Sequence, residues 1–348
     1  MKLLDKILVG LDFSESADNV IQSAIEMAKI FESTIVPVYV LPDTTVDKKL
    51  KALVKKTAQD KLKEAGDRIR AAGLEPTEPL LMVGTPHTAI PRAAVDTNAN
   101  VILVGSGETR SGDSFRLGTT AERIIQKSQK PVFVIKEGIV LNVHQILCPV
   151  DFSEASRRAL KNAITMAGRF KSELTILAVC EQNSLGWFTS EEYQKKENEL
   201  RYQLHKEEFD AFLEEFNLDG INWNREILRG NPAEEILSSI SRKMVDLLIM
   251  GTSGKTGINR MLMGSVTEKV IREVPCSFLT LKSEDMISLQ LESHIRDIEQ
   301  LHSTAMQLID DGFYEEAIAH LKACLNINDM HIPAYKGLAK VYEKMGDT

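Results

Sequence analysis

Short apolar runs alternate with longer segments of helical periodicity along most of the chain. Two early runs, Lys6–Gly10 and Thr34–Val40, predict strands that are buried on both faces, because consecutive apolar residues suit such a position. Between them, Val20, Ile21 and Ala24 recur at helical spacing. The same criteria predict strands at 101–104, 132–135, 145–150, 174–179, 247–250 and 277–281, and long polar helices at 47–71 and 190–216.

Strict alternation of strands and helices predicts an α/β fold with a parallel, doubly wound sheet. Pro86 and Pro232 mark the starts of further helices, since proline is tolerated at the first helical position. In such a sheet a ligand binds outside the carboxyl ends of the strands, where the strand order reverses. We therefore expect a binding crevice beside Asp151 and Gly251, which follow two of the predicted strands.

The chain contains an internal repeat. Asp12–Glu15 recurs as Asp151–Glu154, and Gly105 and Gly118 recur as glycines 146 positions later (105 to 251, 118 to 264). The repeat indicates two tandem domains, called the first and second half below, followed by a helical segment. The expected bounds are 1–138, 143–283 and 289–348.

A glycine-bearing loop in the second half is a candidate phosphate site. Gly251–Gly254 follows the apolar run Val245–Met250, and Gly264-Ser265 begins the next predicted helix, which also carries Thr267. Glycines let the backbone approach an anion closely, and the N–H groups and dipole of a helix N-terminus favour negative charge. The hydroxyl groups of Ser265 and Thr267 add hydrogen-bond donors.

Spacing separates this loop from more common nucleotide motifs. A P-loop that ended in Gly254-Lys255-Thr256 would need a glycine at position 249, where the chain has Ile249. The dinucleotide motif also fails, because two residues separate Gly251 from Gly254 and no third glycine follows at the required offset. The observed pattern, G-x-x-G, nine residues and then G-S, resembles the nucleotide loop of the universal stress protein family.

Each half resembles a universal stress protein domain, with an adenine nucleotide alpha hydrolase-like fold. The resemblance implies that Asp151 holds the ribose, that the backbone of Val179 meets the adenine, and that the loop holds the phosphates. It also implies that the halves pair through their last strands as an internal pseudo-dimer. The implied ligand is ATP, ADP or AMP, and whether Mg²⁺ accompanies it stays open. The implied nucleotide-binding residues are Pro149, Val150, Asp151, Val179, Met250, Gly251, Thr252, Ser253, Gly254, Gly264, Ser265, Val266 and Thr267.

The first half departs from this pattern. Glu108 stands where the second half has Gly254, and a carboxylate there would repel a polyphosphate. Asp12, Gly105 and Gly118 are retained. We interpret the first half as mainly a scaffold for the second, with an altered nucleotide site as the alternative.

The C-terminal segment has a helical pattern. Gly312 recurs as Gly346, one 34-residue period later (312 to 346), which resembles a tetratricopeptide repeat. Ala317, Leu321 and Cys324 fit the small and apolar positions of its second helix. Tyr335, Leu338, Ala339 and Tyr342 fit the first helix of a following repeat. Docking of a partner protein, self-association, or simple stabilisation of the rest of the chain are all open roles for this segment.

Composition narrows the classes of function. The net charge of −8 argues against nucleic-acid and anionic-membrane binding. The sequence has no signal-peptide pattern and no apolar run of membrane-spanning length, so a cytoplasmic location is expected. The four cysteines lack metal-ligand spacing and are expected to be buried thiols, and no metal site is predicted.

Three functions fit these observations. The leading hypothesis is an ATP-binding stress-response or signalling switch with the nucleotide in the second half. A slow ATPase or phosphoryl-transfer enzyme is an alternative, but it needs a base and a Mg²⁺ ligand that the sequence does not identify, and no catalytic residue is predicted. A nucleotide-independent scaffold that acts through the helical segment is the third.

Overall fold

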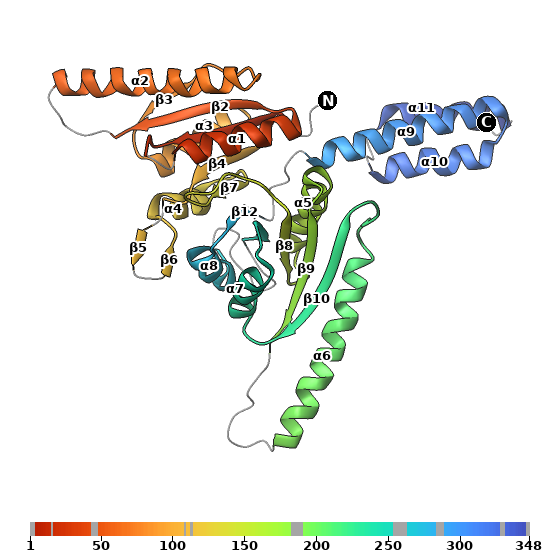
Figure 1. Ribbon diagram of the computed structural model, residues 1–348. Helices are drawn as coiled ribbons and strands as arrows, with labels where there is room; N and C mark the ends of the chain where they lie inside the picture. Colours follow the sequence, from red (N-terminus) through yellow and green to blue (C-terminus); the bar gives the residue numbers. More distant parts are fainter. Residues whose placement is uncertain are drawn as a thin grey trace. The chain divides into compact units, whose positions relative to one another are not determined.

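The computed structural model describes residues 4–14, 17–42, 48–107, 109–111, 114–181, 191–252, 263–282, 289–327 and 331–345. Contacts divide the chain into a sheet unit, Lys2–Ile287, and a helical unit that begins at Ser288. Figure 1 shows the elements of both units, which are described separately here. The two halves of the repeat lie together in the sheet unit.

The sheet unit is built on one ten-stranded sheet with the order β10-β9-β8-β11-β12-β7-β4-β1-β2-β3. Every pairing in this sheet is parallel except that between β12 and β7. The strands of the first half are β1 Lys6–Leu11, β2 Thr34–Leu41, β3 Leu80–Val83, β4 Val101–Gly105 and β7 Val132–Ile135. Those of the second half are β8 Gln145–Val150, β9 Glu173–Cys180, β10 Asn222–Arg229, β11 Leu247–Gly251 and β12 Ser277–Leu281.

Helices connect the strands in each half, as the alternating pattern predicted. The first half contains α1 Ala17–Phe31, α2 Lys48–Ala71, α3 Pro86–Asp96 and α4 Thr119–Lys127. The second half contains α5 Glu154–Phe170, α6 Glu191–Leu213, α7 Pro232–Lys243 and α8 Ser265–Glu273. Pro86 and Pro232 begin their helices, as expected. The α/β fold is therefore confirmed, and the strand order reverses between β1 and β4, and between β8 and β11.

Four strands lie outside the ranges predicted from apolar runs: the edge strands β3 and β10, and the two strands of a hairpin. A two-stranded hairpin, β5 Thr109–Ser111 and β6 Ser114–Arg116, lies in the loop between β4 and α4. Both strands are three residues long and form a separate sheet. The glycine loop of the first half is thus partly folded into a hairpin.

The two halves join edge to edge through β7 and β12. The register pairs Phe133 with Leu279, with Val134 opposite Phe278 on one side. Both Phe133 and Leu279 are fully buried, at 0% exposure. The pseudo-dimer that the family resemblance implied therefore takes the form of one continuous sheet.

The helical unit contains α9 Leu289–Asp311, α10 Tyr314–Ile327 and α11 Ile332–Met345. Ala317, Leu321 and Cys324 are fully buried, as their small and apolar character predicted. Gly337 allows α11 to approach α10, because a Cβ there would lie 2.7 Å from a Leu321 methyl group.

Helix α11 packs through one face of small and apolar residues. Ala334, Gly337 and Val341 form its buried face. Tyr335 and Tyr342, which fit the first helix of a following repeat in the sequence, are 53% and 37% exposed. These tyrosines therefore lie away from the core of the described helices.

Candidate functional site

The turn after β8 places a carboxylate at the end of that strand. Asp151 is exposed, and its Oδ1 accepts hydrogen bonds from the Ser153 backbone N–H at 3.1 Å and from the Ser153 hydroxyl at 2.5 Å. The Ser153 hydroxyl oxygen also accepts from the Ser156 N–H and caps α5. The helix cap thus fixes the orientation of the carboxylate.

Phe152 turns the chain between Asp151 and the helix. Its φ of +63° is unusual for a residue with a side chain and signals local backbone strain. The ring is buried among aromatic side chains, with centroids 5.9 Å from Phe209 and 5.2 Å from Phe212. Packing against α6 therefore supports the strained turn that follows Asp151.

Arg157 supports the same turn from the first turns of α5. Its Nη1 donates to the Phe152 carbonyl oxygen at 2.6 Å, and its Nε and Nη2 donate to the Glu215 carboxylate at 2.7 and 3.0 Å. The Glu215 carboxylate, through this hydrogen bond, raises the pKa of Arg157, and Arg157 in turn lowers the pKa of Glu215. Sequence reasoning missed Phe152 and Arg157, although repetition of the Asp-Phe-Ser-Glu segment was a signal for the turn.

Strand β9, which pairs with β8 on the side away from β11, contributes Val179. It lies near the end of β9, one residue beyond the pairing of Val150 with Ala178, and it is half-buried. Pro149 and Val150 are buried in β8. Val179 is thus near the same edge of the sheet as Asp151.

The described part of the glycine loop begins where β11 ends. A Cβ on Gly251 would lie 2.8 Å from the Cβ of Ala155, so α5 passes too close for any larger residue. The Thr252 N–H donates to the Leu281 carbonyl oxygen at 2.8 Å. Thr252 is 5% exposed and Met250 is 4% exposed, so the side chains of both lie in the core.

Helix α8 begins at the far end of this loop. Gly264 is its N-cap and has no side chain to occupy the first N–H groups of the helix, while its own N–H donates to Thr252 O at 2.8 Å. Ser265 is exposed, whereas the Thr267 hydroxyl donates to the Gly251 carbonyl oxygen at 2.9 Å and so ties the helix to the strand end. Val266 is half-buried against the core.

The sheet brings these predicted residues to one edge. β8 and β11 are parallel neighbours, so Asp151 and Gly251 both lie at the carboxyl ends of adjacent strands. Ser253 and Gly254, also predicted to bind phosphate, lie outside the described residues.

The first half has the same turn. The carboxylate of Asp12 accepts from the Ser14 N–H at 3.0 Å and from the Ser14 hydroxyl at 2.6 Å, and Phe13 has a φ of +57°. The Phe13 ring stacks on Tyr39 with centroids 4.4 Å apart. Both copies of the motif therefore fold in the same way.

A cavity of about 720 Å³ occupies the crevice of the first half. It is lined by Asp12 after β1, Val40 of β2, Gly105 of β4 and Thr119 of α4, among other residues. This volume lies in the usual range for a small-molecule site. Glu108, on which the prediction of an altered site rests, lies outside the described residues.

Three further features bear on function: possible metal ligands, the cysteines, and helices long enough to span a membrane. In the described part of the chain, no group of three or more His, Cys, Asp or Glu side chains is arranged to hold a metal ion. All four cysteines are buried free thiols, and burial raises the pKa of Cys276 to about 12 and that of Cys148 further. Among the described helices, none is both long and apolar enough to span a membrane.

Comparison with known proteins places both halves in one family. The family model described as "Universal stress protein family" matches residues 4–136 and 142–282. Universal stress protein MJ0531 of Methanocaldococcus jannaschii is 35% identical over 142 residues, which cover 40% of this chain and 81% of that protein. Universal stress protein MJ0577 of the same organism is 30% identical over 155 residues, covering 40% of this chain and 96% of that protein.

A solved structure matches the tandem arrangement. A universal stress protein from Archaeoglobus fulgidus aligns with a TM-score of 0.59 at 23% identity, and the match covers 80% of this chain and 98% of that one. This likeness concerns the fold. With a family model that matches twice and covers most of the sequence, the chain belongs to the universal stress protein family.

Proposed function

We propose that the chain binds an adenine nucleotide in its second half and acts as a stress-response or signalling switch. The observation that carries this proposal is the placement of the Asp151 turn and the glycine-capped start of α8 beyond neighbouring strands β8 and β11. A carboxylate suits ribose hydroxyls, and free helix N–H groups suit phosphates. The two groups stand at the point where the strand order reverses.

Each proposed contact has its own chemistry. Asp151 accepts hydrogen bonds from the ribose, and the backbone of Val179 meets the adenine edge. Thr252, Ser253 and Gly254, with the N–H groups that follow Gly264, surround the phosphates. ATP, ADP and AMP share these features, and a titration with and without Mg²⁺ decides whether the ion accompanies the phosphates.

We further propose that the first half is mainly a scaffold. Glu108 in the place of Gly254 disfavours a polyphosphate there. Because the first half has its own cavity, the competing model is that the first half also binds a ligand. Counting the nucleotides bound per chain separates the two models.

The test is to identify and count the bound ligand. Mass spectrometry of the supernatant from denatured protein is expected to detect an adenine nucleotide, and calorimetry of stripped protein to show one ATP per chain. Gly254→Glu copies the residue of the first half and is expected to remove this binding. Protein that carries no adenine nucleotide and binds none in the calorimeter would overturn the proposal.

A second candidate role concerns the helical unit. Ile332, Tyr335, Tyr342 and Met345 of α11 are exposed by 65%, 53%, 37% and 43%, and their spacing places them on one side of the helix. Exposed apolar stripes of this kind mark protein contacts. We propose that α11 docks another chain. Sedimentation of wild type and of Tyr335→Ser/Tyr342→Ser is expected to show self-association that the double variant loses, and equal monomeric behaviour would contradict a homotypic contact.

A further inference from the structure

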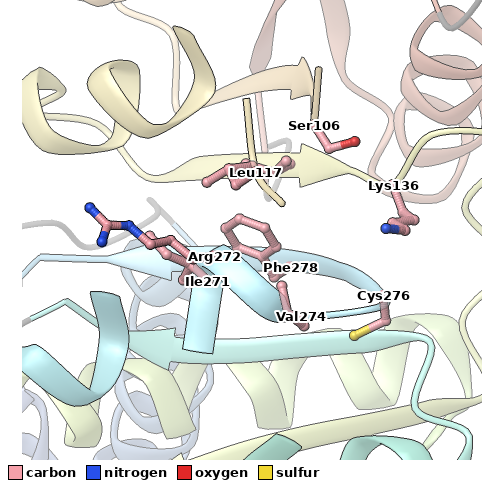
Figure 2. Close-up of a pocket in the computed structure, with 9 residues that line it drawn as sticks. Ser106, Leu117, Lys136, Ile271, Arg272, Val274, Cys276 and Phe278 are labelled. Atoms are coloured by element: carbon pink, nitrogen blue, oxygen red, sulfur yellow. The ribbon is translucent and has the colours of Figure 1, made fainter. Parts of the chain in front are cut away.

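The first half contacts the helix that begins at the proposed phosphate site. Figure 2 shows Leu117 of the first half facing Ile271, Arg272 and Phe278 of the second half. These residues line a small cavity of about 10 Å³. Ile271 and Arg272 belong to α8, a helix of nine residues. At about 1.5 Å per residue, the N-terminus of α8 is only about two turns from this contact.

Arg272 is the centre of the contact. Its Nη2 and Nε donate to the Glu122 Oε1 of α4 at 2.7 and 3.2 Å. Its backbone carbonyl oxygen accepts from the Leu117 N–H at 3.2 Å. The Glu122 side chain is 16% exposed and that of Arg272 is 39% exposed, so the ion pair is only partly shielded from water.

The Arg272 guanidinium contacts one carboxylate from each half, Glu122 of the first and Glu268 of the second. Arg272 Nη2 lies 2.8 Å from Glu268 Oε1, one helical turn earlier. Glu268 is the counterpart of Glu122 at the repeat offset of 146 (122 to 268), whereas the counterpart of Arg272 is Gln126 (126 to 272). A neutral amide cannot form the mirrored ion pair with Glu268, so the Arg272–Glu122 ion pair is not repeated at Gln126, whose backbone carbonyl oxygen instead accepts a hydrogen bond from Lys282 Nζ at 2.8 Å.

We propose that Glu122 and Arg272 are positioning residues for the nucleotide site of the second half. Together they fix α8, and with it the N–H groups after Gly264 that face the phosphates. The proposal rests on the proposed function, since it concerns the same site. It gives the first half a part in binding: the first half completes the site of the second by holding its phosphate-facing helix.

The prediction is specific to the phosphate end of the ligand. Glu122→Gln and Arg272→Gln are expected to weaken ATP binding by about three- to tenfold, a fraction of the stabilisation from one charged hydrogen bond. Binding of adenosine, which carries no phosphate, is expected to stay unchanged. Calorimetry with both ligands at one salt concentration measures the ratio of the two affinities, which a general loss of structure would not alter.

Two controls sharpen the test. The control Glu226→Gln changes another partly buried carboxylate, 23% exposed, which pairs with Arg242 and Lys243 of α7 and not with α8. It is expected to leave both affinities unchanged. The double variant Glu122→Gln/Arg272→Gln is expected to bind ATP as weakly as Arg272→Gln alone, because Arg272→Gln already removes the ion pair that Glu122→Gln breaks.

The outcomes separate this inference from the proposed function. If wild type binds no adenine nucleotide, the proposed function fails. If wild type binds ATP and Glu122→Gln binds it equally well, or loses ATP and adenosine in the same proportion, the positioning role is wrong while the proposed function stands.

Discussion

Phe133 of β7 lies directly opposite Leu279 of β12, and the two residues are equivalent positions of the repeat. In the first half Leu103 pairs with Phe133, and in the second half Ile249 pairs with Leu279. Both residues of the second pair lie 146 positions after those of the first (103 to 249, 133 to 279), which establishes the equivalence. The centre of the internal symmetry therefore passes through this pair. Because both side chains are fully buried, the halves share a continuous apolar layer at the junction.

Phe133→Ala is expected to destabilise the sheet unit strongly. Removal of a fully buried phenylalanine typically costs about 3–5 kcal/mol, which combines lost burial with a cavity. Urea unfolding measures the change in free energy. Phe313→Ala, at a site 56% exposed, is the control and is expected to change stability by less than about 0.5 kcal/mol. Equal effects of the two substitutions would contradict a packed junction.

Gly251→Ala is expected to destabilise by about 1–3 kcal/mol, because the new methyl group would lie 2.8 Å from the Ala155 Cβ and 2.9 Å from its backbone carbon. Gly66→Ala in α2 is a matched substitution with the opposite expectation. Its methyl group would meet only the flexible end of Arg70 at 3.5 Å, and alanine favours the helix by about 0.5–1 kcal/mol. Denaturation midpoints of both variants check these signs. A neutral Gly251→Ala would show that α5 yields at the glycine loop.

Strand positions were predictable because both faces of the sheet are covered, which leaves apolar runs such as Ile7, Leu8 and Val9. The repeated Asp-Phe-Ser-Glu segment likewise located the turn at Asp151. The left-handed backbone of Phe152 gave no signal in the apolar pattern, although Phe13 adopts it as well, with a φ of +57°, in the other copy of the motif. The packing of the Phe152 ring on Phe209 was not predictable, because the two residues are more than 50 positions apart (152 to 209).

The side-chain contact between the two halves at Arg272 escaped sequence analysis because it also joins residues that are far apart along the chain. Arg272 and Glu122 are 150 positions apart, and neither lies in a motif. The β5–β6 hairpin has strands of only three residues, too short to give a periodic signal. The small residues Ala317 and Cys324, in contrast, stood at helical spacing and were correctly assigned to the core of the helical unit.

Stability is expected to fall at alkaline pH through the buried thiols. Burial raises the pKa of Cys276 from its ordinary value of 9.0 to about 12, and raises that of Cys148 as well. The folded state therefore keeps its thiol protons where the unfolded state loses them. This contribution is intact below pH 9 and is lost as the pH rises from 9 toward 12.

Urea unfolding at pH 7.5 and pH 10 tests this dependence. Between these values wild type is expected to lose roughly 1.4 kcal/mol per thiol more than the variant Cys148→Ala/Cys276→Ala. The comparison uses the change with pH within each protein, so the packing cost of the substitutions cancels. Parallel losses in the two proteins would mean that the thiols titrate normally in the folded state.

The central claim, one adenine nucleotide in the second half, is tested most directly by two matched substitutions. Asp151 and Asp12 occupy the same turn in the two halves, each bonded to the serine two residues later. Calorimetric titration of stripped protein with ATP is expected to show one site per chain, weakened about tenfold or more by Asp151→Ala and unchanged by Asp12→Ala, since only Asp151 then loses ribose hydrogen bonds. Binding that survives Asp151→Ala and disappears with Asp12→Ala would contradict the account and place the nucleotide in the first half.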